Sequence, residues 1–422
     1  MVEHAIDASR VLERPLPEGH LFLKSAIEIF TRAMDHVGIK AVTEHCQIDG
    51  LDNLKKDGCL IAGPFLWLVK HESYHDVINL SRAYQRLPEK PVFKAMIRGD
   101  GKYFSNKALN AIVAPFLSSV GIPVQRILAM EGLSEREKKE LRRKNHELME
   151  LTRNNFYEGM SAAVTPEGTT KNDGRVNELM SGFYKLSKIE ADDGAWEFIK
   201  MVPVGNTVDY MAGERWLGKR RERFFCNFGT PFTHPEIERH YDITESGARK
   251  YYESEEEIEE KYKRLVKKEA RKKLIMLNTI TASQLASQYI YWKAQNISYQ
   301  EEGRKPLTVD HQRLSERVAD CVSKIKTLNA SLHDQDKERY AIDSDLLNVS
   351  SRITLIDCFI ENLLERGYGR KGDSGIALER EALFDDTRGK DLKKYNPLLY
   401  MHNRFSQVLE QERDLERKLR IE

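Results

Sequence analysis

Two short stretches of the sequence contain residues that could do chemistry together. Residues 70–76 read Lys-His-Glu-Ser-Tyr-His-Asp, and residues 164–169 read Val-Thr-Pro-Glu-Gly-Thr. The first stretch allows two interpretations of His71, as a ligand of zinc or as a general base. Each interpretation requires a different local structure, and only one can be the chemistry.

The zinc interpretation rests on His71, Glu72 and His75, which fit the His-Glu-x-x-His pattern. Histidines four residues apart lie on one face of a helix and bind the metal, and the Glu acts as base on a zinc-bound water. This requires His71 to lie inside a helix. The pattern also prefers an uncharged residue after the second His, where this chain has Asp76, and no third ligand stands out downstream. We therefore expect no metal, and a zinc metalloprotease stays as the alternative.

The general-base interpretation places His71 in a turn at the end of a strand, with a helix beginning just after it. Ser73 is then a good N-cap, and Asp76 falls in the first turn of the helix. From there its carboxylate can fold back on the imidazole, fix the tautomer and stabilise the imidazolium that forms during proton transfer. The alternative is that Asp76 only completes a Ser-x-x-Asp capping box.

The second stretch is a strand, residues 161–165, followed by a turn. Gly168 lets the backbone approach a ligand closely, and Glu167 can accept hydrogen bonds from the hydroxyl groups of a polyol. Arg126 ends another strand-like segment, and its planar fork of donors suits a phosphate. Taken singly, these residues are also typical of an ordinary turn and of a solvated surface charge.

The order of the motifs along the chain is more informative than any one of them. Six stretches follow one another: residues 48–54, the pair His71 and Asp76, residues 121–126, 166–169, 202–204 and 228–231. Over about residues 45–235 this series resembles the glycerol-phosphate and lysophospholipid acyltransferases. The resemblance implies that His71 is the general base and Asp76 orients it. It also implies that five residues hold the acceptor: Arg126, Glu167, Gly168, Thr169 and Lys171.

Two positions depart from that family's pattern. Lys70 stands where Asn often precedes the His, and Thr170 stands where an Arg commonly follows the Gly-Thr pair. Lys171 or Arg175 could substitute for this Arg, although an ammonium lacks the bidentate geometry of a guanidinium. An acceptor without a phosphate therefore stays open.

The resemblance implies transfer of a fatty acyl group from a thioester, either acyl-CoA or acyl-ACP (acyl carrier protein), to a hydroxyl of glycerol phosphate or a lysophospholipid. No cofactor, metal or covalent serine is needed, because the thioester is already activated. Besides the zinc metalloprotease, a catalytically silent lipid-binding or scaffold protein is the other alternative.

The composition limits the partners and the compartment. With 32% charged residues and a formal net charge of +1, the chain shows no bias toward nucleic acid. Five cysteines without C-x-x-C spacing indicate neither a disulfide framework nor a cysteine-rich metal site, which favours the cytoplasm. No signal peptide and no apolar run of ~20 residues is found, so we expect any membrane contact to be peripheral, on the inner face.

The hydrophobic periodicity predicts an α/β fold with three parts. Residues 1–40 form an arm and a packing helix, residues 41–275 an α/β sandwich, which the resemblance implies is acyltransferase-like, and residues 276–422 an all-helical C-terminal domain. In the sandwich, short strands carry His71, Arg126 and Glu167 into one cleft.

A basic cluster precedes the predicted strand at residues 224–228. It consists of Lys219, Arg220, Arg221 and Arg223. Basic residues near a membrane surface attract anionic headgroups by about 1 kcal/mol each. We interpret the cluster either as a lipid-headgroup site or as a solvated loop.

Overall fold

The computed structural model describes most of the chain from residue 43 onward. The described ranges are 28–29, 32, 43–56, 59–60, 63–71, 82–87, 93–98, 121–124, 134–167, 173–191, 194–216, 219–245, 255–296, 306–333, 340–372, 375–385 and 396–419. The predicted arm and helix of residues 1–40 lie almost wholly outside these ranges.

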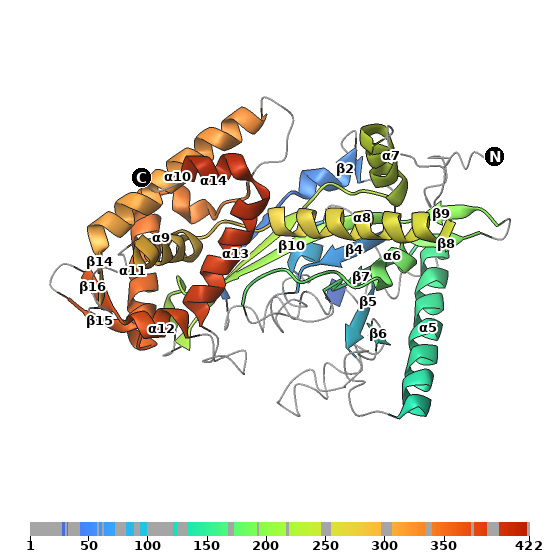
Figure 1. The fold of residues 1–422 in the computed structure, drawn as a ribbon, viewed down its shortest axis with the longest axis horizontal. Coiled ribbons are helices and arrows are strands. Elements are labelled where there is room, and N and C mark those ends of the chain that lie inside the picture. Colours follow the sequence, from blue (N-terminus) through green and yellow to red (C-terminus); the bar gives the residue numbers. More distant parts are fainter. Residues whose placement is uncertain are drawn as a thin grey trace.

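A seven-stranded sheet forms the centre of the fold (Figure 1). Its strands, in spatial order, are β1 (Thr43–Asp49), β13 (Glu222–Phe228), β10 (Lys200–Asp209), β4 (Phe65–Val69), β7 (Ser161–Val164), β5 (Phe93–Arg98) and β6 (Gly121–Val124). From β10 to β6 all neighbours are parallel, whereas β13 runs antiparallel to β10 and parallel to β1. The carboxyl ends of the five parallel strands therefore meet at one edge, where ligands bind in open α/β sheets.

Strand β4 shows why the sheet forms where it does. Its sequence Phe-Leu-Trp-Leu-Val is apolar throughout and buried throughout, as expected of a parallel strand covered on both faces. Leu66 and Leu68 enter the main core, and Phe65, Trp67 and Val69 enter a second core with the helical residues 82–86.

The mostly apolar run of residues 59–69 is divided in the structure. The second half is β4, but Cys59–Leu60 (β3) pairs instead with Lys55–Lys56 (β2) in a separate hairpin. A cis peptide bond joins Gly63 to Pro64 between the two halves. A proline has no N–H to donate to a ladder, so a continuous strand ends there.

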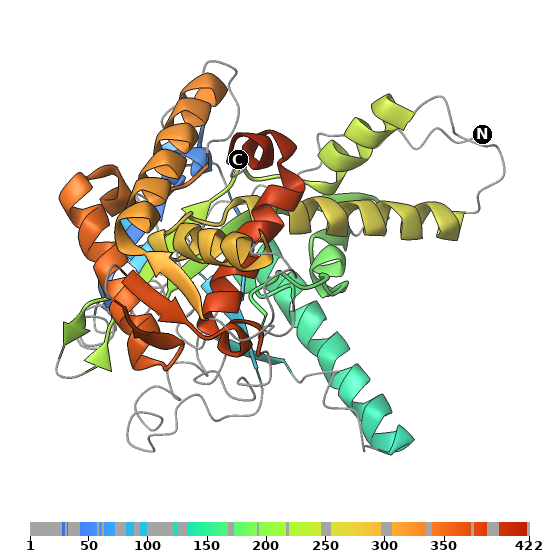
Figure 2. The same cartoon turned by 60° about the vertical axis from the view of Figure 1, so that its left-hand side comes forward.

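Helices lie on and beside the sheet (Figures 1 and 2). Their bounds are α5 Glu135–Tyr157, α6 Gly182–Leu186, α7 His234–Glu245, α8 Glu255–Met276, α9 Ala282–Asn296, α10 His311–His333, α11 Val349–Glu365, α12 Arg380–Phe384, α13 Pro397–Gln411 and α14 Arg413–Leu419. Ser134 and Glu137 form a capping box that starts α5, and Asn396 caps α13 ahead of Pro397. In both views α5 runs away from the sheet.

Shorter elements complete the chain. Two-stranded pairs are β8 (Lys188–Glu190) with β9 (Trp196–Phe198) and β11 (Arg215–Trp216) with β12 (Lys219–Arg220), and two 3-10 turns cover Leu51–Leu54 and Ser344–Leu347. In the C-terminal part, β14 (Leu307–Asp310), β16 (Gly375–Leu378) and β15 (Gly369–Lys371) form a three-stranded sheet.

The prediction of an all-helical C-terminal domain is therefore wrong. Each of these strands has only three or four residues, too few to show an alternating pattern in the sequence. Glycines permit the close pairing, because a Cβ on Gly369 would lie 2.2 Å from the carbonyl oxygen of Ala377.

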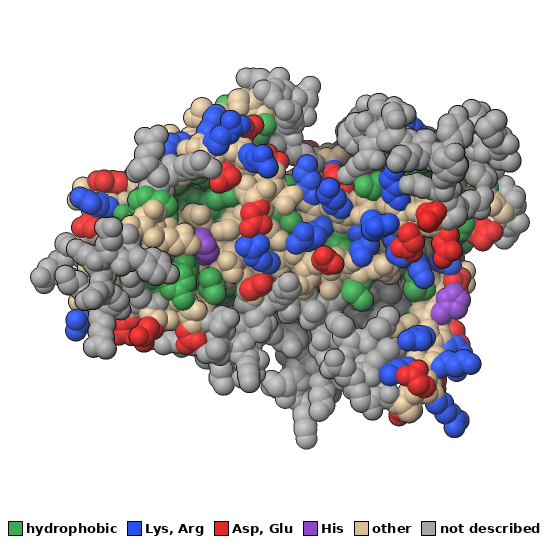
Figure 3. Space-filling model, viewed as in Figure 1, with side chains coloured by type: hydrophobic (Ala, Val, Ile, Leu, Met, Phe, Trp, Pro, Cys, Tyr) green, Lys and Arg blue, Asp and Glu red, His purple; other side chains and the backbone are tan. Residues whose placement is uncertain are grey.

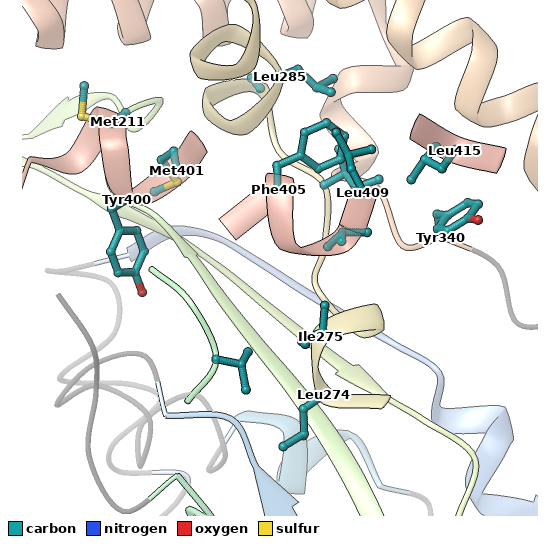
Figure 4. Close-up of a cluster of buried hydrophobic side chains, with 14 of the residues drawn as sticks. Met211, Leu274, Ile275, Leu285, Tyr340, Tyr400, Met401, Phe405, Leu409 and Leu415 are labelled. Carbon is teal, nitrogen blue, oxygen red and sulfur yellow. The ribbon is translucent and has the colours of Figure 1, made fainter. Parts of the chain in front are cut away.

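The main hydrophobic core continues from the sheet into the C-terminal helices. Figure 4 shows Met401, Phe405 and Leu409 on α13 in the same cluster as Leu274 and Ile275 on α8. This core crosses the predicted boundary at residue 275, so α13 packs on the same body that carries the sheet.

Within the described residues, none of the helices combines the length and the apolar character that crossing a bilayer requires.

Candidate active site

His71 lies two residues after the end of β4 and outside any helix. The backbone N–H of Lys70 donates to the carbonyl oxygen of Val204 at 3.0 Å, so the ladder between β4 and β10 continues to the end of the strand. The next N–H, that of His71, donates to Oε1 of Glu167 at 2.9 Å.

The register of the sheet explains this contact. Leu68 pairs with Val164 in the parallel ladder of β4 and β7. Three residues further along each strand, the chain reaches His71 and Glu167. The structure thus brings together two residues that are 96 positions apart in the sequence, at the carboxyl edge of the sheet.

Glu167 is a buried carboxylate that ties two backbone segments together. Its side chain bonds the N–H of His71 through Oε1 and the N–H of Asn177 through Oε2, the latter also at 2.9 Å. Burial raises the pKa of Glu167, while these two hydrogen bonds and the nearby charges of Lys70 and His71 act in the opposite direction. The predicted bond from Glu167 to an acceptor hydroxyl stays a prediction.

The other predicted site residues lie outside the described ranges. They are Asp76, Arg126, Gly168, Thr169 and Lys171. Strand β6 ends at Val124 and runs parallel to β5, so its carboxyl end lies at the same edge of the sheet as His71. The roles of all five residues stay predictions.

The position of His71 bears on the zinc interpretation. That interpretation requires His71 inside a helix, whereas the structure places it after a strand with its N–H bonded to Glu167. Glu72 and His75 lie outside the described ranges. The condition that the zinc interpretation sets for His71 is therefore not met, and the role of His71 as a general base stays a prediction.

Two contributors to this edge were not predicted from the sequence. The side chain of Lys70 is only 1% exposed, and its charge acts on Glu167. A charged residue directly after a five-residue apolar strand was the available signal. Asn177 belongs to a segment without regular structure, and nothing in the sequence indicated that its N–H bonds Glu167.

Three of the predicted motif stretches meet at β10 and β13. The N–H of Gly229 donates to the carbonyl oxygen of Pro203 at 2.9 Å. The side-chain amide of Asn53 donates to the carbonyl oxygen of Phe228 at 2.7 Å. Gly50 has φ +73°, and a Cβ there would lie 2.0 Å from the same Phe228 oxygen. These stretches hold β10, β13 and the loop before β2 together, and the stretch 202–204 also reaches the site, because Val204 accepts the N–H of Lys70.

Two members of the basic cluster, Arg221 and Arg223, lie near acidic side chains of the protein itself. Arg223 is buried, and its guanidinium donates to Asp343 at 2.9 Å, Asp345 at 2.7 Å and Glu44 at 3.3 Å. Arg221 lies 3.7 Å from the same Glu44. The headgroup interpretation is therefore wrong for Arg223, because its guanidinium is buried and already paired with three carboxylates.

The same network contains a group that could coordinate a cation. One ligand atom each from His45, Asp343 and Asp345 lies within 4.8 Å of the others. The guanidinium of Arg223 already donates to both carboxylates, so the positive charge is supplied by the protein itself. This arrangement is an ion-pair network and does not indicate a metal centre.

A groove of about 480 Å³ lies elsewhere, where α5 faces the β8–β9 hairpin and the start of α8. Lys188 there stacks over the ring of Trp196 at 4.4 Å and pairs with Glu259 at 3.0 Å. Neither His71 nor Glu167 lines it.

Comparison with known proteins gives little further information. No family model matches the chain, and no curated protein matches it. Among solved structures, the 1-acyl-sn-glycerophosphate (LPA) acyltransferase PlsC from Thermotoga maritima is similar with a TM-score of 0.30 and 17% identity, over 59% of this chain and 78% of that one. A likeness this weak does not assign the chemistry of this chain.

Proposed function

We propose that the protein is an acyltransferase that moves a fatty acyl group from a thioester to a hydroxyl of a glycerophosphate or lysophospholipid. One observation supports this above the others. The His71 and Pro-Glu-Gly-Thr motifs are joined by the hydrogen bond from the N–H of His71 to Glu167, at the edge of a parallel sheet where ligands bind. Had the two turns opened at opposite edges, the proposal would have failed.

The proposed reaction has one base and no covalent enzyme intermediate. His71 takes the proton of the acceptor hydroxyl as its oxygen attacks the thioester carbonyl and forms the new C–O bond. The tetrahedral intermediate then collapses, the C–S bond breaks, and the imidazolium returns the proton to the leaving sulfur. Asp76 orients the imidazole and stabilises its charged form.

Glu167 contributes by position in this proposal. Because it accepts the backbone N–H of His71, it fixes the position of that backbone and so limits the positions that the imidazole can occupy. A catalytic base must lie within hydrogen-bond distance of the proton it removes, and a displacement of about 1 Å can cost about 100-fold in rate.

The acceptor is held by the residues around this edge. Gly168 and Thr169 let the backbone approach it, and Arg126 with Lys171 binds a phosphate where the acceptor carries one. The donor is acyl-CoA or acyl-ACP, and a lysophospholipid acceptor would be met by peripheral contact with a membrane surface.

The test measures thiol release from an acyl thioester by purified protein, with and without acceptor, and identifies the acylated product by mass spectrometry. We expect release that depends on the acceptor, and a loss of about 10²- to 10⁴-fold in His71→Ala. His146→Ala is the matched control, because that imidazole lies on α5 with 73% of its side chain exposed. Unchanged turnover in His71→Ala would refute the proposal.

Two further measurements separate the alternatives. Zinc bound in a one-to-one ratio and lost in His75→Ala would favour the metalloprotease. Vesicle binding by a protein that shows no turnover with any donor and acceptor pair would favour the silent lipid-binding protein.

A further inference from the structure

We infer that Arg271 on α8 and Gln407 on α13 are positioning residues for His71, acting through residues 175–177 and Glu167. The inference rests on the proposed function, because it assumes that His71 is the base. It gives the C-terminal part of the chain a specific task at the site, which requires no contact with a substrate.

The first link is the second hydrogen bond of Glu167. One carboxylate oxygen fixes His71, and the other accepts the N–H of Asn177 at 2.9 Å. Glu167 is 4% exposed and follows a strand, so its position depends on both backbone partners. If Asn177 moves, the carboxylate and with it the N–H of His71 can move too.

The second link holds the residue before Asn177. Val176 is buried, and its segment has no regular secondary structure that would pair its backbone. The amide of Gln407 supplies both partners, since Oε1 accepts the N–H of Val176 at 2.8 Å and Nε2 donates to its carbonyl oxygen at 3.3 Å. Buried backbone groups need such partners, and leaving one unmade costs about 1–3 kcal/mol.

The third link comes from α8. Arg271 donates from Nη2 to the carbonyl oxygen of Val176 at 3.0 Å and from Nε to that of Asn177 at 3.1 Å. A guanidinium stays charged at every accessible pH, and its rigid fork can hold two successive carbonyl groups at once. Arg271 and Gln407 thus hold the same two residues from two different helices.

Close packing against α13 supports the same segment one residue earlier. Gly174 has φ +80°, and a Cβ there would lie 2.3 Å from the carbonyl oxygen of Tyr400, which Figure 4 places on α13. Arg175 adds a two-point ion pair with Glu410 at 3.2 and 3.0 Å, although this exposed pair contributes little free energy. Residues 174–177 therefore follow the surface of α13 closely.

The hydrogen bonds form one continuous series from α13 and α8 to His71. Gln407 and Arg271 hold Val176 and Asn177, the N–H of Asn177 holds Glu167, and Glu167 holds the N–H of His71. Since a small displacement of a catalytic group costs much rate, loosening this series should slow the chemical step more than substrate binding.

The test compares Arg271→Met with Lys272→Met in the full-length protein. Both changes remove one positive charge from α8, whose outward face carries many basic side chains (Figure 3), but Lys272 is exposed. We expect Arg271→Met to lower kcat about 10- to 100-fold with little change in the KM of the thioester. Arg271→Lys should recover part of the loss, and Lys272→Met should behave as the wild type.

Hydrogen exchange provides a measurement that does not depend on turnover. In Arg271→Met and in Gln407→Met, the amides of Asn177 and His71 should exchange at least about tenfold faster, while amides of β10 keep their protection. A role that is only structural would instead raise exchange throughout the core.

The outcomes separate this inference from the proposed function. If His71→Ala is inactive but Arg271→Met and Gln407→Met keep wild-type kcat and wild-type exchange at His71, the inference is wrong and the proposed function stands. If the wild type shows no turnover, the proposed function fails. Faster exchange at His71 in Arg271→Met and Gln407→Met would still show that these two residues hold the backbone of His71.

Discussion

Arg223 offers the sharpest test of how the C-terminal part is joined to the sheet. Its side chain is 5% exposed and contacts Asp343, which is fully buried, together with Glu44 and Asp345. Replacing Arg223 by Met keeps much of the apolar stem but leaves these carboxylates without their main counter-charge. Removing one partner of a buried ion pair costs about 3–5 kcal/mol, because the other charge stays buried.

The loss should depend on pH in a defined direction. Burial raises the pKa of Asp343 from 3.8 to about 6, although Arg223 opposes this. A carboxyl whose folded pKa lies above its unfolded value lowers the free energy of unfolding as the pH rises from the unfolded value through the folded one. Without Arg223 the folded pKa of Asp343 rises further, so the loss of unfolding free energy in Arg223→Met continues to grow above pH 6. We expect a small loss at pH 5 and the full loss of about 3–5 kcal/mol at pH 8.

The assay is equilibrium urea unfolding of wild type and Arg223→Met at pH 5, 6, 7 and 8. Arg215→Met is the matched control, because that Arg forms an ion pair with Glu365 at 2.9 Å while its side chain is 56% exposed. Such a pair should contribute less than about 1 kcal/mol. A loss in Arg223→Met that is the same at pH 5 and pH 8, or no larger than in Arg215→Met, would refute the reasoning.

Two further substitutions test the edge of the sheet. In Glu167→Gln one backbone N–H loses its acceptor, so kcat should fall about 10- to 100-fold. Burial raises the pKa of Glu167 above 4.5, so the wild type should lose stability relative to the variant as the pH rises, which urea unfolding at several pH values measures. Gly174→Ala should lose more stability in thermal unfolding than Gly194→Ala. Both glycines have positive φ (+80° and +78°), but of the two only Gly174 has backbone atoms within contact of the new Cβ. Equal losses would contradict the close approach of Gly174 to α13.

The sequence predicted that a strand ends just before His71, for a physical reason. A parallel strand buried on both faces must be apolar at successive positions, and β4 meets this requirement over five residues. A polar pair of residues directly after such a run, Lys70 and His71, then has to lie at the strand end. Parallel pairing of β4 with β7 brings Glu167 to the same edge without any further information.

What the sequence could not show is how the segment after Glu167 is held. Residues 173–180 have no periodicity, because they form neither helix nor strand, and their partners are side chains on distant helices. The ion pairs of Arg223 were hidden for the same reason, since a basic cluster reads alike whether its charges face water or buried carboxylates. Local pattern therefore identified the candidate base and not the contacts that position it.

These contacts also bear on where the chain can be divided. Cutting after residue 275 would remove Gln407 and leave the buried N–H and carbonyl of Val176 with fewer partners. Each buried group left without a hydrogen-bond partner costs about 1–3 kcal/mol. The cut would also expose the apolar face of α8 that Phe405 and its neighbours cover. A catalytic unit ending at residue 275 would thus lack both a share of its core and the support of the segment that holds Glu167. The sequence predicts a boundary at residue 275, but Gln407, beyond that boundary, bonds Val176 in the segment that holds Glu167.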